Sequence, residues 1–296
     1  MTVDISYVTL TELKRQWETQ NPANATLSNP VMMEYARRAS AKVDHITGME
    51  FAPRIETRYY DTFGLHIDTS RNTIMLDKPI VELTTTVLAD STSLTTDTDV
   101  RLYPRGATPA IELQIYYPNT NYWTQYTNDP QQSIAITGVW CWRDRYATDG
   151  WKLSGDSVQD AGGINAAVTT VTVTDADGTN WIGDTPRFDL GQLLKVESEY
   201  MTVTAVNTTT QALTVVRGVR GSTAAIHAKD VAISVFTPNP DIVRATQLIA
   251  FYDYARRGTI TQATFDGLAV TQGLEVPGEV NDILNRYKSA MKWMVF

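Results

Sequence analysis

The feature that most constrains this chain is a long amphipathic helix predicted within residues 29 to 51. Asn29 can cap this helix, and Pro30 suits its first position, where a missing N–H costs nothing. Apolar residues recur three and four apart on one side, and charged residues fall mostly on the other. Gly48 is expected to end the helix, because glycine readily adopts the left-handed conformation of a C-cap.

After this helix the apolar period changes from near four to two, which is the period of a β-strand. The first strand is predicted over residues 54 to 61. A Thr/Ser/Asp segment at residues 90 to 99 has no apolar period, and we expect it to be an exposed loop. The remaining strands of this portion are predicted at residues 73–76, 80–88, 101–103, 110–117 and 133–142.

Helices are also predicted near both ends of the chain. The first covers about residues 9 to 18, where Thr9 and Glu12 have the spacing of a capping box. The apolar pattern returns to a helical period at Asp241 and ends near Gly258. A final helix is expected from about Gly278 toward the C-terminus.

Residues 144 to 163 contain several glycine turn signals, and we expect a loop and a domain boundary there. Beyond it, Val/Thr/Leu alternation predicts strands at 168–174, 192–206, 212–216 and 231–236. The predicted fold is therefore α+β. It combines a helical bundle of N- and C-terminal helices with an antiparallel β portion (residues 1–159 and 237–296) and an inserted all-β domain (residues 160–236).

Composition narrows the classes of function. The net charge of −8 argues against a protein that grips nucleic acid, because such binding depends on Lys and Arg at the phosphates. No export signal follows Met1, and no apolar run approaches the length of a membrane span, so we expect a protein with no membrane partner. The single cysteine, Cys141, lies between two tryptophans and is expected to be a small buried hydrophobe.

The sequence contains no pattern that predicts a catalytic, metal or cofactor site. His45, His66 and His227 fall in separate segments without metal-ligand spacing. Glu197 and Glu199 lie two apart on a predicted strand and would share a face, which is the least that a paired-carboxylate hydrolase requires. Exposed strands often carry such pairs, and we expect no enzyme.

The segment at 175 to 186 resembles the start of a calcium loop, with Asp175 and Asp177 followed by Gly178. A calcium loop needs Gly at its sixth place and Glu at its twelfth, where this chain has Asn180 and Pro186. We therefore expect a turn here.

A polar and aromatic stretch follows the predicted strand at 110–117. Its composition suits a protein interface or carbohydrate stacking, and it equally suits a hairpin tip whose rings lie flat on the fold. Among the functional alternatives we favour contact between subunits. The candidate contact residues are Tyr116, Tyr117, Tyr122, Trp123 and Tyr126.

The order of these elements carries a resemblance to a known family. The long helix is followed by Arg54-x-x-Thr57-Arg58-x-Tyr60-Asp61 and then by Leu76-x-x-Pro79-Ile80. This order resembles the head-to-tail adaptor (connector) proteins of long-tailed phages over roughly the first ninety and the last sixty residues. The run from 196 to 227 also resembles a small β module found in phage structural proteins.

The resemblance implies a structural role without an active site. The chain would be one subunit of a ring, about twelve-fold by resemblance, that docks under the portal in the virion neck after assembly in the host cytoplasm. Its partners would be the portal, a tail terminator or stopper protein and copies of itself, with DNA as a transient passenger. Two alternatives stay open: a tail-completion or stopper ring protein, and a virion-surface module that contacts glycan or capsid through the aromatic stretch or the β insert.

The C-terminal segment is the candidate portal-docking element. Its large apolar groups need something to hold them, either the subunit's own bundle or a pocket on the portal. The resemblance favours the portal, with basic residues meeting acidic groups at the rim. The candidate docking residues are Arg286, Lys288, Met291, Lys292, Trp293, Met294 and Phe296.

Overall fold

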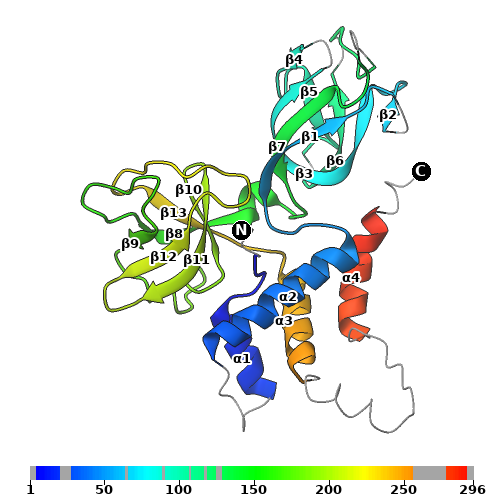
Figure 1. Ribbon diagram of the computed structural model, residues 1–296. Coiled ribbons are helices and arrows are strands. Elements are labelled where there is room, and N and C mark those ends of the chain that lie inside the picture. The colour runs from blue at the N-terminus through cyan, green and yellow to red at the C-terminus, as the bar shows by residue number, and fades with distance from the viewer. Residues whose placement is uncertain are drawn as a thin grey trace, which may run out of the picture. The chain divides into compact units, whose positions relative to one another are not determined.

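The computed structural model describes residues 5–20, 28–63, 66–88, 91–106, 108–116, 119–124, 129–255 and 278–291, with side chains for all but 19, 20 and 289–291. The fold is α+β, as predicted, with two antiparallel sheets and a few helices (Figure 1). Backbone contacts divide the chain into two units. Unit 1 comprises Met1–Gly48, Lys152–Val219 and Thr223–Ala290, and unit 2 comprises Met49–Trp151, Arg220–Ser222 and Met291–Phe296. The boundaries predicted for an inserted domain stay a prediction.

The helices of unit 1 in the described part of the chain are α1 (Leu10–Gln20), α2 (Asn29–Thr47), α3 (Pro240–Ala255) and α4 (Gly278–Met291). The prediction that Asn29 caps the long helix was wrong, because the N-cap of α2 is Ser28, which makes no side-chain cap hydrogen bond. The predicted capping box is confirmed, because the Thr9 N–H donates to Glu12 Oε2 at 2.8 Å and the Glu12 N–H to Thr9 Oγ1 at 3.3 Å. Gly48 has φ 71° and donates its N–H to the Asp44 carbonyl at 2.8 Å, which confirms the predicted C-cap.

Aromatic contacts join three of these helices, and hydrogen bonds attach the fourth. The Trp17 ring of α1 lies edge-on to Phe251 and Tyr254 of α3, with centroids 5.3 and 3.9 Å apart. Helix α2 contacts α3, and its Tyr35 ring lies edge-on to Tyr254 with centroids 5.6 Å apart. The Tyr287 hydroxyl of α4 donates to Asp241 Oδ1 at 2.8 Å, at the start of α3.

Unit 1 also contains the second sheet, with strand order β8-β13-β10-β11-β12-β9 (Figure 1). Its strands are β8 (Trp151–Ser157), β9 (Thr170–Thr172), β10 (Leu193–Val196), β11 (Glu199–Asn207), β12 (Ala212–Val216) and β13 (Ala232–Phe236). Phe188, Met201 and Leu213 are fully buried in its core.

Two sequence predictions about this region were wrong in detail. The strand predicted at 192–206 is a hairpin, β10 and β11, that turns at Glu197 with φ 53°. The loop predicted at 144–163 contains a π-helical turn, Tyr146–Gly150, and the edge strand β8. Ser154 of β8 donates its hydroxyl to the Ile233 carbonyl of β13 at 2.7 Å, a long-range bond that local turn signals do not reveal.

Unit 2 is built on the first sheet, with strand order β1-β7-β3-β6-β5 and with β2 and β4 paired to β3. The strands are β1 (Arg54–Tyr60), β2 (Ile67–Asp68), β3 (Thr73–Val87), β4 (Ser93–Leu94), β5 (Val100–Tyr103), β6 (Ala110–Ile115) and β7 (Ile134–Trp140). Ile74, Leu113 and Ile136 lie in its core.

Strand β3 corrects another prediction, because residues 73–76 and 80–88 were expected to form two strands and form one. Its first part pairs mainly with β6 and its second part with β7, with shifts of register between Met75 and Ile80 and after Ile80. Pro79 lies at this exchange of partners, where it donates no ladder hydrogen bond. Gly138 of β7 lies opposite the register shifts of β3. A Cβ at this position would come within 2.7 Å of Ile80 Cδ1, so a larger residue would not fit without a shift.

Candidate functional site

The face of the first sheet opposite its core carries arginine and tyrosine side chains from adjacent strands. The register places Arg101 beside Gln114 and Tyr103 beside Glu112, while the alternating Val100 and Leu102 point to the core. We call this surface the arginine–tyrosine face. It consists of Arg71, Arg101, Tyr103, Glu112, Gln114 and Tyr116.

Two arginines of this face lie over tyrosine rings. The Arg71 Cζ lies 4.9 Å from the centroid of Tyr103, and its Nη2 donates to Glu112 Oε2 at 2.9 Å. The Arg101 Cζ lies 3.7 Å from the centroid of Tyr116. Such stacks hold both side chains flat on the sheet. Tyr and Arg are enriched at protein interfaces, so the composition suits a surface that contacts another protein.

The structure separates the predicted subunit-contact residues into surface and core. Tyr116 and Tyr122 are 43% and 58% exposed. Trp123 is fully buried, and its indole N–H donates to the Asn72 carbonyl at 2.8 Å, so it is a core residue that cannot itself face a partner. Tyr117 and Tyr126 lie outside the described residues.

The predicted portal-docking residues lie on α4 and beyond it. Arg286 has a side chain that is 68% exposed, with Nη1 3.8 Å from Asp241 Oδ2, and Lys288 is partly exposed. The backbone of Met291 ends α4. The Met291 side chain and all of Lys292, Trp293, Met294 and Phe296 lie outside the described residues.

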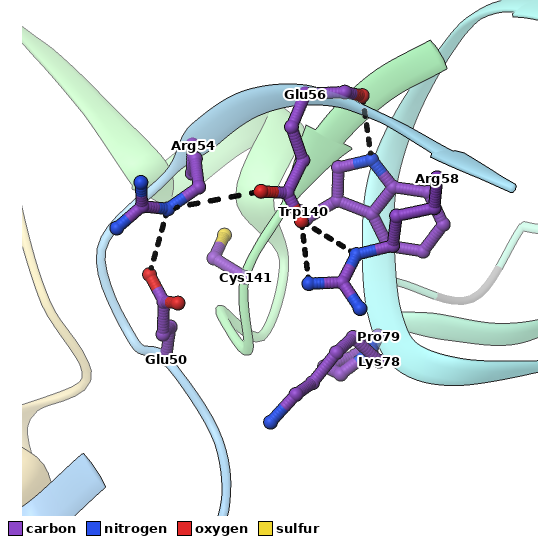
Figure 2. Close-up of a pocket in the computed structure, with 8 residues that line it drawn as sticks. All are labelled: Glu50, Arg54, Glu56, Arg58, Lys78, Pro79, Trp140 and Cys141. Atoms are coloured by element: carbon purple, nitrogen blue, oxygen red, sulfur yellow. Dashed lines mark hydrogen bonds and ion pairs between the residues drawn. The ribbon is translucent and has the colours of Figure 1, made fainter. Parts of the chain in front are cut away.

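A small hollow of unit 2 is lined by alternating charges around Trp140 (Figure 2). Glu56 bridges Arg54 and Arg58, with its Oε1 accepting from Arg58 Nε at 2.5 Å. The Arg58 Cζ lies 5.0 Å from the centroid of Trp140. The hollow measures about 10 Å³, room for about one water molecule, which is far too small for a metabolite.

The wall of this hollow is fixed by an arginine distant in the sequence. Arg220 Nη2 donates to Glu50 Oε2 at 2.6 Å and to the Ala52 carbonyl at 2.7 Å. Burial raises the pKa of Glu50, but Arg220 and Arg54 outweigh it and leave that pKa below its usual value. Cys141 is buried, as predicted, and burial raises the pKa of its thiol. The hollow is thus a structural ion-pair network with an unreactive thiol.

The second sheet contains a buried charged cluster that sequence reasoning missed. His227 lies between two carboxylates, with Nδ1 2.7 Å from Glu197 Oε2 and Nε2 2.8 Å from Glu199 Oε2. The expectation that Glu197 and Glu199 share a strand face was wrong, because Glu197 occupies the β10–β11 turn. The two carboxylates converge on opposite sides of one imidazole.

Glu199 and Arg217 form the centre of this cluster. The Glu199 carboxylate, fully buried, accepts from Arg217 Nε at 2.6 Å and Nη2 at 2.7 Å and from the Gly218 and Ala225 N–H groups. Burial raises the pKa of Glu199, but hydrogen bonds from Arg217, Ala225 and His227 outweigh it and lower the pKa to about 2. Every group is engaged, so the cluster fits a structural role. The only feature of the sequence that could have indicated this cluster is the position of Arg217 and His227 on either side of one glycine-containing loop.

A cavity of about 430 Å³ lies in unit 1 between residues 5–15 and the loop 180–193. Its polar groups are used internally. Asp189 accepts the Thr11 N–H at 2.7 Å, and Asp184 forms an ion pair with Arg15. Ile182 on its rim is 73% exposed. The volume would admit a small molecule, but the lining carboxylates of Glu12, Asp184 and Asp189 are bonded within the chain.

Within the described ranges, no three His, Cys, Asp or Glu residues are placed to hold a metal ion, and no helix is long and apolar enough to cross a membrane. In comparisons with protein-family models, with curated proteins and with solved structures, none matched this chain.

Proposed function

We propose that this chain is a structural protein of a phage neck, a subunit of an adaptor ring that docks under the portal and joins the DNA-filled head to the tail. The observation that carries the proposal is the order of sequence elements, from the Gly48-capped helix through the Arg54–Asp61 and Leu76–Ile80 patterns to the C-terminal helices. That order resembles head-to-tail adaptors. The proposal includes a helical core made of α1 to α4 and an inserted β domain.

Two structural observations support this role over an enzymatic one. The buried charged groups around Glu199 are fully occupied with one another, and the hollow around Trp140 admits about one water molecule. The partly exposed arginine–tyrosine face has the composition of a protein contact surface. In the proposed ring, DNA passes through a channel without lasting contact, and the net charge of −8 is compatible with weak adhesion to phosphates.

The mass of the purified chain, alone and mixed with the portal protein of the same virus, tests this function. A subunit weighs 33.0 kDa, so native mass spectrometry resolves each added copy. We expect a closed multi-copy ring, formed alone or on the portal. A chain that stays monomeric and ignores the portal would contradict the proposal.

A stopper or tail-completion ring protein is the second candidate, since the same features serve any ring of the neck. It would form a multi-copy ring that binds a preassembled adaptor–portal complex and does not bind the bare portal. The third candidate, a virion-surface module, would bind glycan or capsid protein and leave the portal unbound.

A further inference from the structure

Arg101 differs from Arg71, the other arginine of the arginine–tyrosine face, because it has no acceptor among the described residues. It lies on β5, the edge strand of the first sheet, in one row with Gln114 and Thr73. Its Nε is buried and has no hydrogen-bond partner, and in the described part of the chain Arg101 forms no hydrogen bond and no ion pair. Thr73 Oγ1, in the same row, is also buried and has no hydrogen-bond partner among the residues that the structure describes.

The nearby carboxylates are already engaged elsewhere. Asp99 accepts the Thr95 N–H at 2.8 Å and Asn119 Nδ2 at 2.6 Å. Glu112 accepts from Arg71, which is the second arginine stacked on this face. Arg101 is therefore a cation held flat against Tyr116, and its donors are unused within the described part of the chain.

A guanidinium that is partly removed from water without an acceptor is unfavourable, because it loses hydration and gains no hydrogen bond. A carboxylate from another molecule would remove that cost, and a planar guanidinium held in place by a ring is preorganised to receive one. The Arg71 pair shows the completed arrangement on the same sheet: an arginine over a tyrosine with a carboxylate at its nitrogens.

We infer that Arg101, held on Tyr116, binds a carboxylate side chain of a second copy of this chain. This inference rests on the proposed self-assembly. The chain has 33 acidic and 25 basic residues, so a neighbouring copy presents an excess of carboxylates.

The test measures self-assembly of the full chain by sedimentation velocity over a range of concentrations and salt. Arg101→Ala should raise the concentration needed for assembly at least about tenfold, since truncating one partner of a buried interfacial ion pair has effects of this size or larger. Arg101→Lys should restore assembly only in part, because an ammonium lacks the planar fork. Added salt should weaken wild-type assembly more than assembly of Arg101→Ala.

Arg38→Ala is the matched control. The Arg38 Cζ lies 5.9 Å from the centroid of the Tyr35 ring in unit 1. Arg38 already forms an ion pair with Glu34 of the same chain. This variant should assemble like the wild type. Circular dichroism and urea unfolding of each variant establish that the fold is intact before assembly is compared.

Unchanged assembly of Arg101→Ala would overturn the inference and leave the proposed ring intact. A wild-type chain that never self-associates would also overturn it, and the portal mixture would then decide separately whether the proposed function stands. Loss of portal binding in Arg101→Ala with self-assembly unchanged would assign the arginine to a different partner and so contradict a second copy as the occupant.

Discussion

Arg217 and Arg101 show the two uses that this molecule makes of arginine. In unit 1, the five N–H groups of Arg217 are matched by five hydrogen bonds, to both Glu199 oxygens and to the carbonyls of Asn165, Val168 and Ala225. In unit 2, Arg101 has an aromatic ring on one side and no acceptor in the described part of the chain. The difference lies in whether the N–H groups have acceptors within the chain. By this criterion, more than by burial or charge, a structural arginine is distinguished from one that is available to a partner.

The largest expected loss of stability comes from changing Glu199, the centre of the buried charged cluster of unit 1. Glu199→Gln removes the charge that Arg217 requires and leaves a buried cation, which should lower the free energy of unfolding by about 3 to 5 kcal/mol. Urea denaturation measures this loss in the free energy of unfolding. Glu197→Gln is the matched control, because its side chain is 57% exposed and should cost less than about 1 kcal/mol. Equal losses in the two variants would contradict the central place of Glu199.

The same carboxylate predicts a dependence of stability on pH. The pKa of Glu199 falls from 4.5 to about 2 on folding, so its contribution is fully present above pH 4.5 and is lost as the pH falls toward 2. The stability difference between the wild type and Glu199→Gln should therefore narrow across that window. Urea unfolding at a series of pH values checks this, and a constant difference down to pH 2 would argue that Glu199 does not hold a depressed pKa.

A smaller effect distinguishes core from surface within the aromatic stretch. Trp123→Phe removes the indole hydrogen bond to the Asn72 carbonyl, which keeps only the Ile115 N–H, and replaces a fully buried ring by a smaller one, so it should cost about 1 to 3 kcal/mol. Tyr122→Phe is the parallel change at a 58% exposed neighbour and should stay within about 0.5 kcal/mol. Thermal unfolding of both variants makes the comparison. If Tyr122→Phe proved the more damaging, the placement of the two rings would be wrong.

The smallest expected effect on stability comes from the C-terminal segment. Removing residues 292 to 296 should leave the free energy of unfolding nearly unchanged and abolish binding to the portal, because Trp293, Met294 and Phe296 are proposed anchors for a partner pocket. Native mass spectrometry with the portal and urea unfolding of the truncated chain check the two halves of this prediction. Binding that persists, or a fold that is lost, would assign the segment to the subunit itself.

The sequence predicted those parts of the structure that depend on local order. The capping box of Thr9 and Glu12 and the C-cap at Gly48 are confirmed because each involves residues within four positions. The alternation in residues 54 to 61 gave β1 within a residue. The prediction of an α+β fold rests on such periods and is confirmed at that level.

The candidate surfaces were harder to predict because they depend on distant partners. Trp123 lies in a polar stretch without apolar period, and its place in the core depends on packing against distant strands and on its bond to Asn72, 51 positions away. The Glu199 cluster joins positions up to 52 apart, through the bond from Arg217 to Asn165. Neither Arg71 nor Arg101 was singled out, because a stack across strands depends on register, which the hydrophobic pattern alone did not supply.

Hydrogen–deuterium exchange on the free and the assembled chain tests the contrast between the two regions most directly. Peptides covering residues 100–116 should gain protection on assembly, because Arg101 and Tyr116 become covered by another copy. Peptides covering residues 193–217 should exchange alike in both states, since the Glu199–Arg217 arrangement is complete within one chain. Protection confined to 193–217, with no change at 100–116, would contradict the assignment of the arginine–tyrosine face to assembly.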